Sequence, residues 1–333
     1  MSTVLRPHRT ALLPFVAAHP EVMVLSADLT ASCEADLLRD RMPERFLSLG
    51  MAEQNMVGFA AGMAREGLTP WLHTFAVFLT RRTFDQVAMS VAYPNLRVRL
   101  AGFLPGITTP GGVTHQAVDD LALMRAIPNM TVLSCGDATD CETVLEAAQA
   151  VDGPVYLRIL RGVVPRLFPV SEPLQVGCCR VLSRGSDVAI LTEGICTEEG
   201  LRAAGALRRR GLAVTHLHVS TLKPFPATQL LEALAGVRRG AVTLENHGIT
   251  GGLGSAVAEV MAGAGLGLPL VRLGLRDVYA QGASREYLMR RHGLDAAALV
   301  AAVERLAGEG FDIPAEELTA DVTAADEARV EDL

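Results

Sequence analysis

The stretch "GMAEQNMVGFAAGMAREG", residues 50–67, sets a carboxylate at the start of a segment that is otherwise mostly small or apolar. Its spacing predicts a helix with one apolar stripe, formed by Glu53, Val57, Ala60 and Ala64. A carboxylate on such a stripe is costly to ionise unless it is paired, protonated or used in chemistry. From this segment alone, the simpler interpretation is a half-solvated first-turn glutamate that the helix dipole favours.

Outside this stretch, short apolar runs rich in β-branched residues alternate with longer helical patterns. The expected strands are 22–28, 46–50, 71–75, 98–103, 131–135 and 155–160, then 187–194, 213–220, 241–247 and 270–275. Such alternation is typical of parallel sheets covered by helices on both faces. We expect an α/β protein with two successive parallel-sheet domains, 1–170 and 171–313, followed by an acidic, mobile tail at 314–333.

The composition excludes several classes of function. The 333 residues are 50% hydrophobic and carry a net charge of -7, without the basic face that a nucleic-acid partner requires. No segment approaches the roughly 20 apolar residues of a membrane span, and the N-terminus has no signal-peptide core, so we expect a cytoplasmic protein. Six cysteines without a CxxC pair predict neither a zinc site nor disulfides, and we expect no metal ligands on this chain.

Three further segments are informative mainly through their order. Residues 73–87, "HTFAVFLTRRTFDQV", follow a predicted strand and look like ordinary core when taken alone. Residues 111–130 place His115 in a glycine-rich loop before a helix, where a lone histidine is usually structural. Residues 245–261, "ENHGITGGLGSAVAEVM", lack the GxGxxG spacing of a dinucleotide loop and indicate close packing of a strand on a helix.

In this order, these segments together resemble the C-terminal half of transketolase, over nearly the whole chain up to about residue 310. The resemblance implies a thiamine-diphosphate pyrimidine-binding fold followed by a transketolase C-terminal domain. It also implies thiamine diphosphate as cofactor, which carries the chemistry while the protein orients and polarises it. A glutamate at the position of Glu53 bonds the pyrimidine ring nitrogen in this family, which would explain its place on an apolar stripe.

The same resemblance assigns further residues to the cofactor and to catalysis. His115 matches the histidine that donates to a substrate oxygen as charge builds on it. Arg81 stands where transketolases often carry a tyrosine. The remaining cofactor-binding candidates are the aromatics Phe75 and Phe78, which would pack on the aminopyrimidine, and Asp28.

Substrate phosphate would be bound by Arg6, Ser32 and Arg158, because guanidinium groups bind phosphate through paired hydrogen bonds. The substrate loop departs from the family. Gly111 stands where an acid contacts a substrate hydroxyl, and Phe103 where a histidine helps hold phosphate. We expect tolerance for a ketone or a branched acceptor resembling apulose phosphate, unless Thr108 or Thr109 restores the lost contact.

The chain lacks the GDG signature of the domain that holds diphosphate and Mg²⁺ in this family. We therefore expect a separate, GDG-bearing N-terminal transketolase subunit that holds most of the Mg²⁺ site. The two chains would form an α2β2 heterotetramer with active sites between subunits, acting on sugar phosphates. The alternatives are a 2-oxoacid dehydrogenase E1 β subunit, a deoxyxylulose-phosphate synthase, which is normally one long chain, and a non-catalytic partner module. The neighbouring reading frame would discriminate among them.

Overall fold

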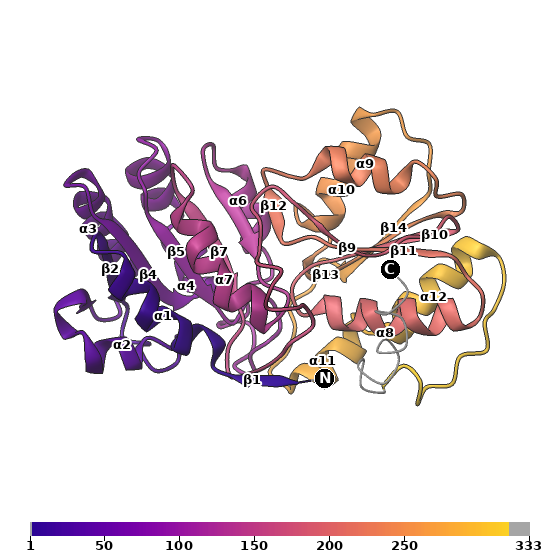
Figure 1. Ribbon diagram of the computed structural model, residues 1–333, viewed down its shortest axis with the longest axis horizontal. Helices are drawn as coiled ribbons and strands as arrows, with labels where there is room; N and C mark the ends of the chain where they lie inside the picture. The colour runs from indigo at the N-terminus through magenta and orange to yellow at the C-terminus, as the bar shows by residue number, and fades with distance from the viewer. Residues whose placement is uncertain (1, 320–333) are drawn as a thin grey trace.

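A seven-stranded sheet forms the centre of the N-terminal domain in the computed structural model, which describes residues 2–319 (Figure 1). Its strand order is β12-β6-β7-β5-β4-β2-β3, with all neighbours parallel except β12 and β6. Strands β1 and β8 form a separate antiparallel pair. The elements of this part are β1 (Thr3–Leu5), α1 (Pro7–Ala18), β2 (Val22–Ser26), α2 (Asp36–Arg41), η1 (Pro43–Arg45), β3 (Phe46–Ser48), α3 (Glu53–Arg65), β4 (Thr69–Phe75), α4 (Ala76–Thr80), α5 (Phe84–Gln86), the π-helix η2 (Val87–Ala92), β5 (Arg99–Phe103), α6 (Asp120–Ala126), β6 (Thr131–Ser134), α7 (Ala138–Gln149), β7 (Val155–Ile159) and β8 (Val163–Pro165).

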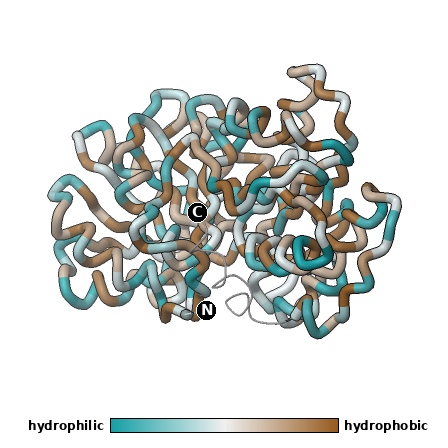
Figure 2. Tube along the Cα trace, turned by 45° about the vertical axis from the view of Figure 1, so that its right-hand side comes forward, coloured by the Kyte–Doolittle hydropathy of each residue, from teal (hydrophilic) through white to brown (hydrophobic). Residues whose placement is uncertain are grey.

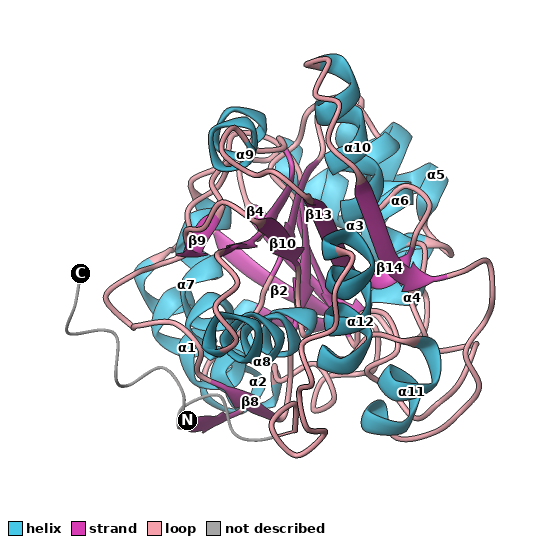
Figure 3. Cartoon of the chain, turned by 90° about the vertical axis from the view of Figure 1, so that its right-hand side faces the viewer, coloured by secondary structure: helices cyan, strands magenta, loops and turns pink. Residues whose placement is uncertain are grey.

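Helices cover both faces of this sheet. In Figure 3, α1 and α7 lie on one side of the strands, whereas α3, α4, α5 and α6 lie on the other. Every residue of β4 is buried, as expected of a central parallel strand between two helical layers. On α3, Glu53, Val57 and Ala60 are buried and Ala64 is partly buried, so the helix and its inward stripe agree with the sequence pattern.

The C-terminal domain is built on a five-stranded sheet in the order β14-β13-β10-β11-β9, parallel except at the edge strand β9. Helices α9 and α10 cover one face, and α8 and α12 cover the other (Figure 1). The prediction of an α/β protein with two successive parallel-sheet domains is thus confirmed. The elements are β9 (Arg180–Ser183), β10 (Val188–Thr192), α8 (Cys196–Arg209), β11 (Val214–His218), β12 (Thr221–Lys223), α9 (Ala227–Leu234), β13 (Gly240–Gly248), α10 (Leu253–Gly263), β14 (Leu270–Leu275), α11 (Arg285–His292) and α12 (Ala296–Ala307).

The two domains share structure. Strand β12 follows β11 in the chain but completes the N-terminal sheet, with Thr221 opposite Leu133 of β6. The Lys223 ammonium donates to the carbonyls of Arg125 and Ile127, at 3.0 and 2.5 Å, and so caps the end of α6. The larger apolar core also includes side chains of both domains, and this cross-domain packing fixes how the two sheets meet.

Polar and apolar stretches alternate along the coloured part of the trace, as expected of elements that bury one face (Figure 2). Residues 315–319 form a turn in which Leu318 is buried and Glu317 forms ion pairs with Arg209 and Arg210. The sequence predicted a mobile tail from residue 314, and most of that tail, residues 320–333, lies outside the described part, so its mobility stays a prediction. No helix among the described residues is long and apolar enough to cross a membrane.

Candidate active site

Glu53 is the first residue of α3, and its side chain is only 2% exposed. Arg82, from the turn after α4, donates a 2.7 Å hydrogen bond to its Oε2. A buried carboxylate requires such a partner, because burial removes the water that would otherwise stabilise its charge. Glu53 is therefore not the half-solvated first-turn acid of the simpler interpretation.

An aromatic cluster lies beside this carboxylate. Phe75 ends β4 and stacks with Phe78 of α4, with ring centres 5.9 Å apart and planes inclined by 21°. The Arg82 guanidinium lies over the Phe78 ring, 4.5 Å from its centre. His115 meets Phe78 edge-on, with ring centres 5.5 Å apart. Contacts through Arg82 and the two phenylalanines thus link Glu53 to His115, although the segments that carry them are far apart in the sequence.

Arg81, which the resemblance assigned to the cofactor, forms an ion pair with Asp119. Its Nε donates to both carboxylate oxygens of Asp119 at 2.9 Å. The neighbouring Arg82 instead contacts Glu53 and Phe78. Arg82, a residue that the sequence analysis missed, is thus the arginine that contacts Glu53, and the assignment of Arg81 to the cofactor stays a prediction.

His115 lies in an irregular segment between β5 and α6, which we call the His115 loop (residues 104–119). Its imidazole is half-buried, with Nδ1 2.8 Å from the Thr114 hydroxyl. Gly111 lies against it, since a Cβ built there would be 3.1 Å from the His115 Cβ. The Thr108 hydroxyl donates to the Pro105 carbonyl, and the Thr109 hydroxyl accepts from the Gly111 amide. The hydroxyl hydrogen of Thr108 is thus used within the loop, whereas Thr109 only accepts a bond there.

Phe103 does not face a substrate. It ends β5, is fully buried, and packs its ring 5.2 Å from the His8 ring and 5.8 Å from the His73 ring. The expectation that this position borders the substrate is wrong, because the chain enters the His115 loop only after Phe103. Asp28 is exposed after β2, with a left-handed φ of 63°, and its placement leaves it available to a ligand.

Arg6 and Ser32 lie near each other, together with Arg161, which the sequence analysis did not select. Pairing of β1 with β8 sets Leu5 opposite Val163, and the Arg6 amide donates to the Gly162 carbonyl at 2.6 Å. The exposed Arg161 donates from Nη1 to the Ser32 carbonyl at 2.9 Å. Arg161 follows the carboxyl end of β7, where open α/β sheets bind their ligands, and this position was the available signal.

Arg158 is a structural residue. Its side chain is 1% exposed on β7 and bridges Asp120, at 2.5 Å, and Glu193, at 3.3 Å. Burial alone would raise the pKa of Asp120, but Arg158 beside it holds that pKa below its ordinary value. The guanidinium also donates to the carbonyls of Ala117 and Asn246. The expectation that Arg158 binds phosphate is wrong, because its donors are already used between the two domains.

Glu34 lies between the exposed arginines. Its Oε1 accepts from the Gly162 amide at 2.7 Å, and its Oε2 accepts from the Arg9 amide at 3.2 Å. Burial raises the pKa of Glu34, although these amides and the charges of Arg6 and Arg161 oppose the shift. The carboxyl group thus fixes the backbone that presents the two arginines.

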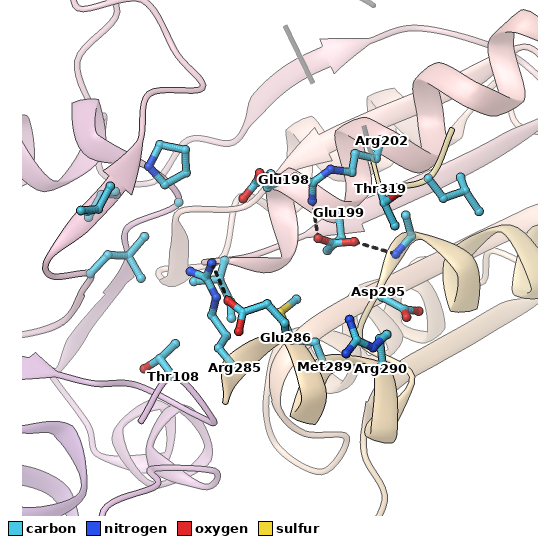
Figure 4. A pocket seen from close by; sticks show the side chains of 18 of the residues that line it. Thr108, Glu198, Glu199, Arg202, Arg285, Glu286, Met289, Arg290, Asp295 and Thr319 are labelled. Carbon is cyan, nitrogen blue, oxygen red and sulfur yellow. Dashed lines mark hydrogen bonds and ion pairs between the residues drawn. The ribbon is translucent and has the colours of Figure 1, made fainter. Parts of the chain in front are cut away.

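A cavity of about 1090 Å³ joins this arginine cluster to the His115 loop. Arg6, Arg161 and Glu34 line one part, and Thr108 and Pro110 of the His115 loop line another. Figure 4 shows Thr108 on the side of Arg285 and Glu286 of α11, with charged side chains of α8 farther along the wall. The labelled lining residues of the C-terminal domain are Glu198, Glu199, Arg202, Arg285, Glu286, Met289, Arg290, Asp295 and Thr319.

Both parts of the chain match domains of one family of enzymes. Residues 8–166 match the pyrimidine-binding domain of transketolase, and residues 177–299 match the transketolase C-terminal domain. A putative uncharacterized transketolase family protein of Sinorhizobium fredii is 37% identical, over 90% of this chain and 87% of that protein. A 6-deoxy-6-sulfo-D-fructose transketolase subunit of Clostridium sp. is 38% identical, over 89% of this chain and 91% of that protein.

A solved structure described as a split gene transketolase, inactive beta4 tetramer, is also similar. It superposes with a TM-score of 0.82 at 37% identity, covering 90% of this chain and 96% of that one. The α/β architecture and the domain order thus agree with a transketolase-type subunit. The chain belongs to the transketolase family.

Proposed function

We propose that this chain is one subunit of a two-chain transketolase, which transfers a two-carbon ketol unit between sugar phosphates with thiamine diphosphate as cofactor. The observation that carries the proposal is the buried Glu53 carboxylate at the start of α3, beside the stacked rings of Phe75 and Phe78. A second candidate, a non-catalytic module, is less well supported because such a module would need neither a buried carboxylate nor a histidine at this place.

The residues present suit an aminopyrimidine. The Arg82 guanidinium is planar and carries nitrogens, and it makes the two contacts that such a ring would make, one with the face of Phe78 and one with the Glu53 carboxylate. Flat rings gain by packing on aromatic faces, and a carboxyl group can share a proton with a ring nitrogen. Thiamine diphosphate, when bound, supplies the thiazolium ring that carries the two-carbon unit.

The remaining roles follow from the chemistry of each side chain. Glu53 would hold a proton on the pyrimidine nitrogen, and Phe78 would orient the ring. His115 would donate from its imidazole to a substrate oxygen on which negative charge builds. Arg6 and Arg161 would bind substrate phosphate, because guanidinium groups pair with phosphate oxygens and both side chains border the cavity. Arg161 takes the role that the sequence had assigned to Arg158.

A partner chain would complete the site. This chain has no GDG signature, and a partner carrying one would hold the diphosphate and Mg²⁺. Large apolar side chains are exposed beside Glu53, on α3 and on the helical segments that pack near it, which favours a protein interface there. They are Met51, Phe59, Phe84, Met89 and Tyr93. Glu53 and Phe78 also lie outside the lining of the described cavity, as expected if the partner forms the other wall.

Reconstitution tests the proposal. The chain is titrated calorimetrically with thiamine diphosphate and Mg²⁺, alone and after co-expression with an N-terminal transketolase subunit that carries the GDG signature. We expect tight binding and ketol transfer only in the two-chain complex, with a titration lacking Mg²⁺ as control. Micromolar binding by the isolated chain, or a complex that decarboxylates 2-oxoacids instead, would contradict the proposal.

A further inference from the structure

The His115 loop contains one isolated β-bridge, between Pro105 and Ala117, and Arg81 binds its last residue, Asp119, but contacts from the C-terminal domain hold its base and its tip. At its base, the Asn246 side chain at the end of β13 makes two hydrogen bonds with loop backbone. Its Oδ1 accepts from the Ile107 amide at 2.9 Å, and its Nδ2 donates to the Pro105 carbonyl at 3.0 Å. Asn246 is 1% exposed, so these bonds form away from water. The amide thus supplies both bonds that a neighbouring strand would supply.

The approach of Asn246 is close enough to require a glycine. Gly106 has a left-handed φ of 58°, and a Cβ built on it would lie 2.2 Å from the Asn246 Oδ1. No side chain can occupy that space without moving the loop or the asparagine. The base of the loop and the asparagine are therefore fitted to each other.

A second contact holds the tip of the loop, near His115. Segment 276–284, which joins β14 to α11, packs on the loop. The Gln116 side chain donates to the Gln281 carbonyl at 3.2 Å. A Cβ built on Gly282 would lie 2.8 Å from the Pro110 carbonyl oxygen, although Gly282 has no left-handed φ. Gly282 is therefore needed because it lets segment 276–284 approach the loop closely, and not because of its backbone conformation.

Asn246 is itself fixed by the buried charges described above. The backbone N–H of Asn246 donates to the Glu193 carboxylate at 2.9 Å, and its backbone carbonyl accepts from Arg158 at 3.2 Å. Glu193 also accepts from the Ser134 hydroxyl at 2.6 Å. Because these partners are buried and mutually bonded, the Asn246 backbone has one well-defined place.

We propose that Asn246 is a positioning residue for His115, and that the C-terminal domain sets the geometry of the His115 loop through Asn246 and Gly282. The chemical role of His115 rests on the proposed function, whereas the positioning of the loop does not. A catalytic group must be held within about 0.5 Å of its productive place, and a loop of this length needs outside contacts to achieve that.

The loop contacts are tested on the full chain by amide hydrogen exchange with mass spectrometry. Asn246→Ala removes both hydrogen bonds at the base of the loop. Gly282→Ala places a methyl group against the Pro110 carbonyl at its tip. We expect exchange across residues 104–119 to become about 10- to 30-fold faster with Asn246→Ala, as the loss of two buried hydrogen bonds predicts. Asn246→Asp keeps the acceptor for the Ile107 amide but sets a buried carboxylate oxygen against the Pro105 carbonyl, so its effect should be at least as large.

Two control variants match these changes elsewhere in the C-terminal domain. Gln229→Ala removes a side-chain bond to the Cys179 amide, and Gly236→Ala adds a methyl where nothing lies within 4 Å. Neither should alter exchange in the loop. Unchanged loop exchange in both Asn246→Ala and Gly282→Ala would overturn the proposal. Gly282→Ala leaves the buried charges intact, so it still tests the proposal if Asn246→Ala does not fold.

The functional consequence is measured in the two-chain complex by a double-mutant cycle with His115→Ala. If Asn246 acts through His115, Asn246→Ala lowers kcat about tenfold or more at nearly constant KM and adds little once His115 is absent. Fully additive losses would overturn the positioning role. Faster loop exchange in a complex without ketol-transfer activity would instead support the loop positioning and contradict the proposed function.

Discussion

Two arginines three residues apart, Arg158 and Arg161, should respond in opposite ways to replacement by methionine. Arg158→Met leaves the carboxylates of Asp120 and Glu193 buried without their cation, since the Arg158 side chain is 1% exposed and both carboxylates 0%. Removing one partner of a buried ion pair costs about 3–5 kcal/mol. We expect the free energy of unfolding of the full chain to fall by about this amount.

Arg161→Met removes an exposed guanidinium that donates to the Ser32 carbonyl. Exposed substitutions usually change stability by no more than about 0.5 kcal/mol, so this variant should unfold like the wild type. In the two-chain complex, however, loss of a charge-assisted bond to phosphate, worth about 1.5–3 kcal/mol, should raise KM for a phosphorylated substrate about 10- to 150-fold.

Urea unfolding, followed by far-UV circular dichroism, measures the first difference, and steady-state kinetics measure the second. The reasoning would be refuted if Arg158→Met unfolded within 0.5 kcal/mol of the wild type, a margin about the size of an ordinary surface effect, while raising KM. That outcome would return Arg158 to the phosphate site and remove Arg161 from it.

Two further predictions concern pH and substrate choice. Burial lowers the pKa of His73 to about 4, against a hydrogen bond to the Trp71 carbonyl that raises it. The unfolded state therefore binds more protons between pH 6.5 and 4, so stability should fall by up to about 1.4 kcal/mol per unit as the pH drops through this range. His73→Gln should flatten that slope in urea titrations at several pH values, and an unchanged slope would rule out this histidine as its source. If Gly111 stands where the family carries a hydroxyl-reading acid, as the resemblance implies, kcat/KM for dihydroxyacetone phosphate should at least equal that for ribose 5-phosphate, with xylulose 5-phosphate as donor. A strong preference for ribose 5-phosphate would exclude the altered acceptor.

The parts of the structure that depend on periodicity could be predicted from the sequence. Both series of strands, and the inward stripe of α3 with Glu53 at its start, follow from the spacing of apolar residues. The choice between adjacent arginines could not be made in this way. Arg81 and Arg82 both lie in the turn after α4, and helical periodicity does not fix the directions of turn residues.

Strands buried on both faces hide their polar residues from pattern analysis. All residues of β7 are buried, so no alternation in "VYLRI" indicated that Arg158 faces two carboxylates from distant segments. Strand β12 is only three residues long, and its partner β6 lies almost 90 positions earlier, so local sequence carries little information about their pairing. The contact between Asn246 and the His115 loop is equally long-range, since it depends on how the two domains meet.

Exchange of the thiazolium C2 proton tests the central claim most directly, because it reports on the proton that Glu53 is proposed to help remove. It is followed by NMR in deuterated buffer in the two-chain complex, for the wild type and for Glu53→Ala, with circular dichroism as the check on folding. We predict that Glu53→Ala slows the exchange by about 10²- to 10⁴-fold, as expected for loss of positioned acid–base assistance. Exchange at a near-normal rate in a folded Glu53→Ala complex would contradict the account and leave Glu53 as a buried partner of Arg82 alone.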